Sequence, residues 1–298
     1  MAGTIAPPDA DPHEVAMTEL LRLRSSKPKF SNASKKLDSL VEARKEIQGV
    51  FVSLNGKEER NDSSTTAGAS FRAQLRNVSA ACNNLRVAMS QASYQADFDQ
   101  PALLCALEHA NEVYSDLVFW PKTTPVNWRY KPRNAPKDVQ AYGVSNLFLF
   151  GSFHHAAIWQ VYFCCRVQMC ESILQAYTFL KEQSHPNSPP APSGLSEEDV
   201  RAAMIAAVDD VCSCAPYLLS DVDEEGHMKR NSVDSKTLGA FFYLRGLMVT
   251  NGIENLPRRQ RRLLLHLFGR LGAQFGIRVA WRMRDDWVAD HGTEAEEL

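Results

Sequence analysis

The chain has 298 residues, of which 44% are hydrophobic and 23% are charged, with 33 Lys and Arg against 35 Asp and Glu. This is the composition of an ordinary globular protein, and the length allows one large domain or two small ones. The net charge of −2 excludes a general electrostatic attraction to nucleic acid or to membrane surfaces.

The N-terminal segment contains no basic stretch followed by an apolar one, so we expect no secretory signal. The Asn-x-Ser sequences at Asn32, Asn61 and Asn77 are then chance matches to glycosylation sites. Without export, the seven cysteines lie in a reducing compartment, where structural disulfides are rare.

Helical periodicity dominates the first third of the chain. Asp11-Pro-His-Glu14 predicts a helix start, because Asp11 can cap the helix and Glu14 can reach back to the cap amide. Apolar residues recur at helical spacing over 37–54 and again over 71–89, with a polar segment predicted as a loop at 57–69. We expect these two helices to pair as a helical hairpin over residues 37–89.

The middle of the chain predicts a long apolar helix over about 144–183. A shorter helix precedes it, starting at Pro101 and stopping before Pro121, and residues 120–137 form an irregular link with four prolines. The stretch 147–165 approaches the ~20 residues that a bilayer span needs. Because His154, His155 and Gln160 interrupt it, we interpret it as a central buried helix.

A Pro/Ser-rich connection at 185–194 leads to the last helices. Ser196-Glu-Glu-Asp199 is a capping pattern, and the helix that it starts is expected to end at Pro216. A polar loop over 220–235 precedes two predicted helices, about 236–253 and 257–284. We find no convincing alternating strand pattern and no internal repeat.

These elements predict an all-α fold, with several helices in an orthogonal or bundle-like array around one long buried central helix. We expect a helical N-terminal region at 1–120, a second helical domain at 121–284 and an acidic tail at 285–298.

Cysteine and histidine are the first candidates for metal chemistry. A zinc binuclear cluster needs six closely spaced thiolates beginning with Cys-x2-Cys, and the chain has no Cys-x2-Cys. The closest groupings are Cys164-Cys165, Cys170 and Cys212-x-Cys214, which we interpret as small buried apolar residues. The neighbours His154 and His155 do not share a helix face, as an i, i+4 pair would.

Catalytic patterns are also missing from the sequence. There is no Gly-x-Ser-x-Gly elbow and no Gly-rich phosphate loop, and the glycines at 269, 272 and 276 fall within a helical pattern that suits close helix packing. We therefore expect no catalytic, cofactor-binding or metal-binding residues, and we expect that the protein is not an enzyme.

The sharpest electrostatic signal is Arg258-Arg-Gln-Arg-Arg262. Eight arginines and no acidic residue occur between Arg258 and Arg284, whereas 285–298 holds six acidic residues and no Lys or Arg. The cluster could be a nuclear import signal, a phosphate-contacting patch, or the exposed first turn of an amphipathic helix. Because a helix dipole disfavours cations at the N-terminus, the cluster indicates an anionic partner, for which the acidic tail is one candidate.

Five short segments, which follow one another along the chain in the same order as in the family, resemble the C-terminal regulatory region of the fungal zinc-cluster transcription factors. Trp159-Gln-Val-Tyr-Phe-Cys-Cys-Arg166-Val167 is similar to that family's Trp-Asn-x-Tyr-Arg-x-x-Arg-Ile helix. The other segments are Trp128-Arg-Tyr130, Cys214-Ala-Pro-Tyr217, Gly239-Ala-Phe-Phe-Tyr-Leu-Arg-Gly-Leu247, and a closing helix with Arg261-Arg-Leu-Leu-Leu, Leu271-Gly272 and Gly276-Ile-Arg-Val-Ala280. Gln160, Phe163 and Arg245-Gly246 depart from the family's pattern. The resemblance covers about residues 125–282.

The resemblance implies an all-helical regulatory domain that acts through partners or effectors and is not an enzyme. It implies a nuclear location, with the cytoplasm as the alternative. The family reads DNA with its zinc cluster, which this chain lacks, so we expect no direct sequence-specific DNA binding and no membrane association. The expected partners are a zinc-cluster regulator, a second copy of this chain, or a small-molecule effector.

Two other interpretations remain open at this point. One is a helical accessory or biosynthetic protein with a buried ligand pocket. The other is a plain scaffold whose partner-binding element is the predicted hairpin at 37–89.

Overall fold

The structure is a computed structural model that describes residues 62–94, 100–135, 137–140, 144–183, 195–223, 225–227, 237–251, 253 and 255–291. All of them belong to one compact unit, Val52–Leu298. The predicted helices at 11–24 and 37–54, and with them the first half of the predicted hairpin, lie outside the described residues.

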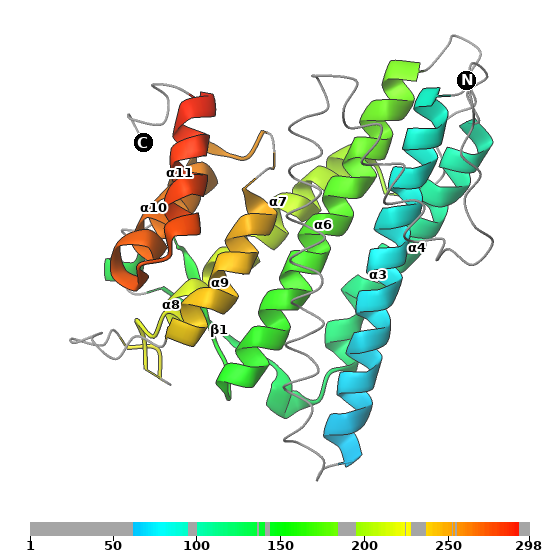
Figure 1. Cartoon of the computed structure of the whole chain (residues 1–298). Helices are drawn as coiled ribbons and strands as arrows, with labels where there is room; N and C mark the ends of the chain where they lie inside the picture. The colour runs from blue at the N-terminus through cyan, green and yellow to red at the C-terminus, as the bar shows by residue number, and fades with distance from the viewer. Residues whose placement is uncertain are drawn as a thin grey trace, which may run out of the picture. The chain divides into compact units, whose positions relative to one another are not determined.

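The described residues are mainly helical, which confirms the all-α prediction. The longest apolar element is α6, Phe153–Gln183, in which 18 of 31 residues are buried. It packs against α3 and α4 on one side and against α7 and α9 on the other (Figure 1). A helix contacted from several directions cannot keep a polar face, which explains why its sequence is apolar on nearly every side.

Helices α3, Asp62–Tyr94, and α4, Gln100–Thr123, form an antiparallel pair that lies against α6. The ring of Phe71 near the start of α3 lies 4.6 Å from that of Trp120 near the end of α4. Helix α3 begins at Asp62, inside the segment predicted as a loop. Helix α4 passes Pro121 and ends one turn later than predicted, which is possible because a proline in the last turn removes only one helical hydrogen bond.

A small antiparallel hairpin precedes α6, at a place where the sequence shows no alternating strand pattern. After the 3₁₀ turn η2, Val126–Trp128, strand β1, Lys131–Asn134, pairs with β2, Asn146–Leu149, in the register Pro132↔Phe148. The short helix α5, Lys137–Gln140, lies between them. Strand β2 ends in three consecutive buried residues, so it lacks the alternation that identifies a strand in sequence. Helix α6 therefore begins at Phe153 rather than at 144.

Helix α7, Glu197–Ser213, starts with the predicted capping box, in which Ser196 Oγ accepts a hydrogen bond from the Asp199 amide. The short helix α8, Ala215–Leu218, follows, and α9, Thr237–Thr250, then packs on α6, α8 and α10. Close approach requires glycine at one point in α9. A Cβ on Gly239 would lie 1.9 Å from the carbonyl oxygen of Leu218.

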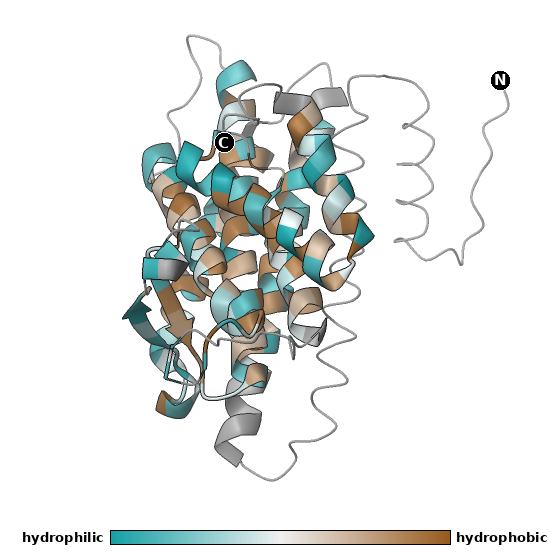
Figure 2. Ribbon diagram, turned by 90° about the vertical axis from the view of Figure 1, so that its left-hand side faces the viewer, coloured by the Kyte–Doolittle hydropathy of each residue, from teal (hydrophilic) through white to brown (hydrophobic). Residues whose placement is uncertain are grey.

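The predicted last helix is in fact two helices, α10, Arg258–Phe275, and α11, Arg278–His291. Gly276 adopts φ 67° and ends α10 as a left-handed cap, a conformation that glycine adopts at little cost. Residues 285–291, interpreted from the sequence as part of an acidic tail, lie within α11. Most helical ribbons carry both hydrophilic and hydrophobic residues (Figure 2).

Within the described part of the chain, no helix is long and apolar enough to cross a membrane. The apolar stretch 147–165, which approached the required length, divides between β2, the turn at Gly151-Ser152 and the first half of α6.

Candidate functional site

Two of the segments singled out in the sequence meet at the first half of α6. The indole Nε1 of Trp159 donates a hydrogen bond to the carbonyl oxygen of Trp128 at 2.7 Å. The ring of Tyr130 meets that of Trp159 edge to face at 4.7 Å. Further contacts join Trp159 to Trp120 and Tyr162 at 5.3 Å each. The Trp128-Arg-Tyr130 link is therefore fixed to α6 by an aromatic cluster.

Helix α9, which carries another of these segments, packs on the opposite side of α6. The rings of Phe153 and Phe242 lie 5.5 Å apart. Further along the same two helices, a Cβ on Gly246 of α9 would lie 1.9 Å from the amide Nε2 of Gln160 of α6. Gln160 and Gly246, two positions that depart from the family's pattern, thus fit one another.

The amide of Gln160 is an unusual feature of this interface. Its side chain is 2% exposed, and both its Nε2 and its Oε1 lack a hydrogen-bond partner among the protein atoms. Leaving a buried polar group unpaired costs about 1–3 kcal/mol. Gln160 therefore meets α9 through packing contacts and without a hydrogen bond to the described part of the chain.

The best-developed polar cluster joins α6 to α7. Arg166 Nη1 lies 2.8 Å from Asp210 Oδ2, and the two side chains are only 16% and 26% exposed. The guanidinium carbon of Arg166 lies 5.9 Å from the ring centre of Tyr162. Tyr114 from α4 and Tyr130 from the link before β1 interact electrostatically with Arg166. Four separate parts of the chain therefore converge on one charged pair.

Burial raises the pKa of Asp210 to about 6, although the charge of Arg166 acts in the opposite direction. Burial also raises the pKa of Tyr114 and that of Tyr130 to about 12, so both hydroxyls stay protonated at neutral pH. The cluster can therefore donate hydrogen bonds and take up a proton near neutrality. Sequence reasoning quoted Arg166 and Tyr130 as motif residues but missed Asp210, which lies 44 positions away from its partner.

The cysteines are mostly buried thiols. Cys164, Cys165, Cys170, Cys212 and Cys214 are buried, Cys82 is partly buried and Cys105 is exposed, and all are free. Burial raises the pKa of Cys164 to about 12 and those of Cys82 and Cys170 to about 11. A protonated thiol is a poor nucleophile and a poor metal ligand.

His154 and His155 lie against the aromatic cluster. Their ring centres are 6.3 Å and 5.2 Å from that of Trp128, and both side chains are partly exposed. Neither histidine is a core residue. In the structure neither residue belongs to a converging set of metal-binding side chains among the described residues.

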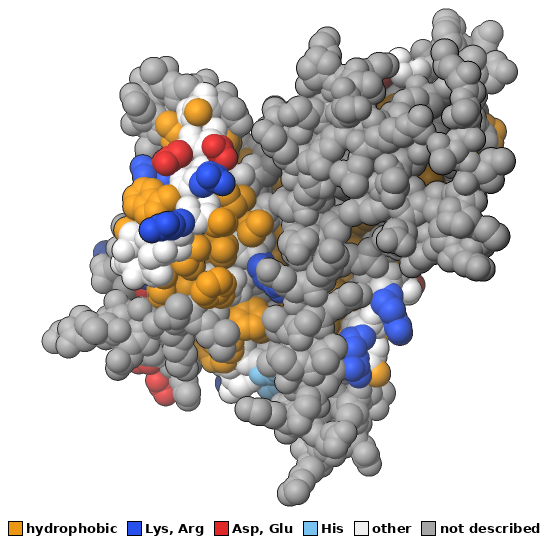
Figure 3. Space-filling view, in the orientation of Figure 1, with side chains coloured by type: hydrophobic (Ala, Val, Ile, Leu, Met, Phe, Trp, Pro, Cys, Tyr) orange, Lys and Arg blue, Asp and Glu red, His pale blue; other side chains and the backbone are white. Residues whose placement is uncertain are grey.

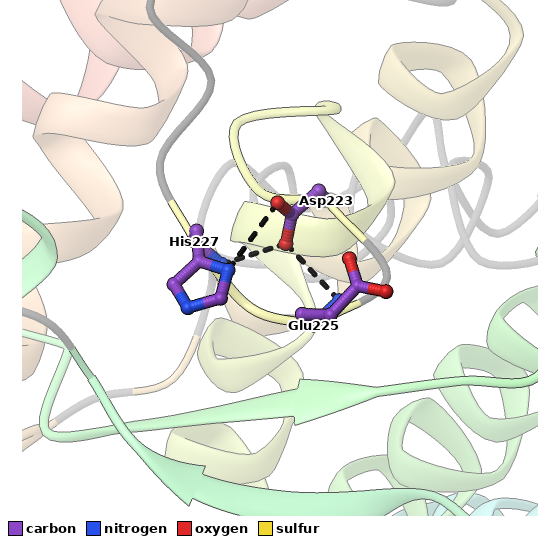
Figure 4. Close-up of side chains that lie close together, drawn as sticks. All are labelled: Asp223, Glu225 and His227. Carbon is purple, nitrogen blue, oxygen red and sulfur yellow. Dashed lines mark hydrogen bonds and ion pairs between the residues drawn. The ribbon is translucent and has the colours of Figure 1, made fainter.

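The loop after α8 does contain such a set, which sequence reasoning missed. Atoms of Asp223, Glu225 and His227 lie within 4.8 Å of one another (Figure 4). The spacing Asp-x-Glu-x-His in the polar loop was the available signal. Asp223 Oδ1 already accepts hydrogen bonds from the Glu225 and His227 amides at 3.0 and 2.8 Å, and Oδ2 lies 3.4 Å from His227 Nδ1. Asp223 thus organises an exposed turn.

The arginine cluster begins α10, and the described part of the chain gives it protein partners. Arg259 lies 3.4 Å from Asp209 of α7, and Gln260 Nε2 donates to the Ile205 carbonyl at 2.8 Å. Further along α10, Arg270 forms a two-fold ion pair with Asp221. These arginines therefore hold α10 against α7 and the segment after α8.

Beside Arg259 the surface forms a small open hollow. Its wall includes Ser145, Asn146, Asp209 and Arg259. Because the two charged residues pair with each other across it, the hollow presents no unbalanced charge to a ligand.

Compared with known protein families, curated proteins and solved structures, the chain matches none. The resemblance to the fungal zinc-cluster regulators therefore rests on the sequence motifs alone.

Proposed function

We propose that this protein is a helical regulatory domain of the type found in fungal zinc-cluster transcription factors, acting by binding a partner protein or a small effector. One observation carries the proposal. Segments that resemble the family at Trp128–Tyr130 and Gly239–Leu247 lie far apart in sequence, yet both pack on α6, which carries the third such segment, Trp159–Val167.

The chemistry of the described side chains favours binding over catalysis. Arg166 and Asp210 neutralise one another, and the tyrosine hydroxyls and buried thiols around them are held in their protonated forms by burial. Such a set can hold a hydrogen-bonding ligand or fix helix positions. It offers no activated nucleophile, which catalysis by acyl or glycosyl transfer would require.

The proposal is tested by tethering the whole chain to a heterologous DNA-binding domain and measuring a reporter gene. We expect transcription to rise or fall relative to the DNA-binding domain alone, and relative to a fusion with an unrelated helical protein of similar size. The purified chain is expected to give no shift with duplex DNA. An unchanged reporter, with the fusion present in the nucleus, would count against a regulatory role.

A second candidate is a helical accessory protein that binds a small molecule near Arg166 and Asp210. The convergence of Tyr114, Tyr130 and this pair favours it, because buried titratable groups with shifted pKa values are enriched at functional sites. A thermal-shift screen with carboxylate and phenol ligands would test it. A ligand that stabilises the wild-type protein but not an Arg166→Gln variant would favour this candidate over the regulator.

A further inference from the structure

Helix α11 exposes a tryptophan. Trp281 is 37% exposed, whereas Trp120, Trp128, Trp159 and Trp287 are at most 7% exposed. Tryptophan is costly to leave in water and is enriched at the centres of protein interfaces. Trp281 is therefore the tryptophan of this chain that a partner can reach most easily.

Arginines surround this indole on the same helix. Arg278 and Arg284 lie one turn before and one turn after Trp281, and the Arg284 guanidinium carbon is 5.3 Å from the indole centre. Arg282 is adjacent in sequence. Arg278 and Arg282 are exposed and form no ion pair with the described part of the chain. Figure 3 shows hydrophobic and basic side chains next to each other over these helices. We call Arg278, Trp281, Arg282 and Arg284 the Arg–Trp ridge.

One edge of the indole packs on α10. Gly272 lies directly under it, since a Cβ there would come within 2.5 Å of Trp281 Nε1. Ala273, next to Gly272 in sequence, is exposed, and a Cβ on Gly276 would meet nothing within 4 Å. The rest of the indole stays exposed, so a partner can reach it while α10 holds it in place.

Charge decides what such a partner looks like. Arg259 and Arg270 of α10 already pair with Asp209 and Asp221, whereas Arg278 and Arg282 are exposed, and arginine binds carboxylates through paired hydrogen bonds. A duplex nucleic acid is less suitable, because Asp285 and Asp286 are exposed on the next turn of α11 and would repel an extended row of phosphates. A short acidic segment with apolar residues needs only the first half of the helix.

We propose that the Arg–Trp ridge of α11 docks an acidic peptide segment of a partner protein, whose carboxylates pair with Arg278 and Arg282 while an apolar side chain covers Trp281. The inference rests on the proposed function, because it names the chemistry of the partner through which the domain acts.

The test is calorimetric titration of the full chain with a synthetic amphipathic peptide that has Glu and Asp around Leu and Phe. Its matched control carries Gln and Asn in place of the acids. We expect binding of the acidic peptide only, weakened by added salt because exposed charges are screened. The double variant Arg278→Gln/Arg282→Gln should raise Kd about tenfold or more, as for loss of interface arginines.

The variant Arg72→Gln/Arg76→Gln is the control for charge, because these residues form an exposed pair with the same spacing on α3. It should leave Kd unchanged. Equal binding of both peptides, no binding, or equal loss in both double variants would overturn the proposal. So would tighter binding of random duplex DNA through the same arginines, or sedimentation showing that Arg278→Gln/Arg282→Gln disrupts a dimer instead.

The two proposals fail separately. A reporter that responds to the tethered chain while the peptide does not bind overturns only the docking surface. Peptide binding with an unresponsive reporter overturns only the regulatory role.

Discussion

Replacing Gly239 by alanine tests the packing of α9 in the most direct way. The new Cβ would lie 1.9 Å from the Leu218 carbonyl oxygen and 3.0 Å from its carbon. Carbon–oxygen contacts are normally no closer than about 3.3 Å, so α9 and α8 must separate by more than 1 Å. Neither atom can rotate away, because both belong to the backbone. Overpacking of this kind costs about 1–3 kcal/mol, of which helix propensity returns up to about 1 kcal/mol.

Gly269→Ala is the matched control, because it makes the same change within α10. There the nearest atom to a Cβ is Arg284 Cδ at 3.5 Å, an ordinary contact, so only the gain in helix propensity of up to about 1 kcal/mol remains. We expect the two variants to differ by about 2 kcal/mol, or about 4–8 °C in Tm for a chain of this size. Urea denaturation followed by circular dichroism measures the difference. A Gly239→Ala variant as stable as Gly269→Ala would refute the close approach of α9 to α8.

Three further changes test the site. Asp210 has its pKa raised from 3.8 to about 6, so the folded protein holds a proton there that the unfolded chain has released, and stability should fall as pH rises through that window. At 1.36 kcal/mol per pKa unit the full effect is about 3 kcal/mol, of which about 2 kcal/mol falls between pH 4.5 and 7. Asp210→Asn should remove this part of the pH dependence in urea titrations at those two pH values; equal pH dependence in the variant and the wild type would contradict the burial of this carboxyl. Gly246→Ala should destabilise the protein by about 1–3 kcal/mol, and Gln160→Ala in the same chain should recover part of the loss, since the two residues share one space; additive effects in a double-mutant cycle would show no contact. Cys105 should react fastest with a maleimide, because it is exposed whereas five other thiols are buried, and Cys105→Ser should abolish the fast phase seen by mass spectrometry; a fast phase that persists in the variant would refute this assignment.

The scaffold interpretation also becomes easier to test. Removing residues 1–95 would delete α3, whose Phe71 and Leu85 are fully buried, and would expose the core. Because the described residues belong to the unit Val52–Leu298, a chain that begins at residue 52 is the suitable truncation for measuring self-association.

Local patterns were enough to predict most helices. The capping box at Ser196 and the proline before Arg258 fixed two helix starts, because these signals act within a single turn. The break at Gly276 was missed, since a glycine inside a helical pattern suits close packing as well as a left-handed cap. The β hairpin was missed because Leu147, Phe148 and Leu149 are all buried and show no alternation.

The candidate site was less predictable than the fold. Arg166 and Tyr130 were noted as motif residues, but nothing in the sequence pairs Arg166 with Asp210 or places Tyr114 beside them. Side-chain pairing across helices depends on the rotation and height of each helix, which apolar periodicity does not specify. The sequence likewise predicted an anionic partner for the arginine cluster Arg258–Arg262, with the acidic tail as one candidate, and among the described residues Asp209 of α7 pairs with Arg259.

The amino-acid sequence by itself determined that this protein is built of helices around one apolar helix, because periodicity and capping act over a few neighbouring residues. Only the tertiary structure decided which buried charges meet, which glycines allow two backbones to touch, and that Trp281 stays at the surface between arginines. Those features depend on distances between residues far apart in the chain, and such distances are fixed only when the helices pack.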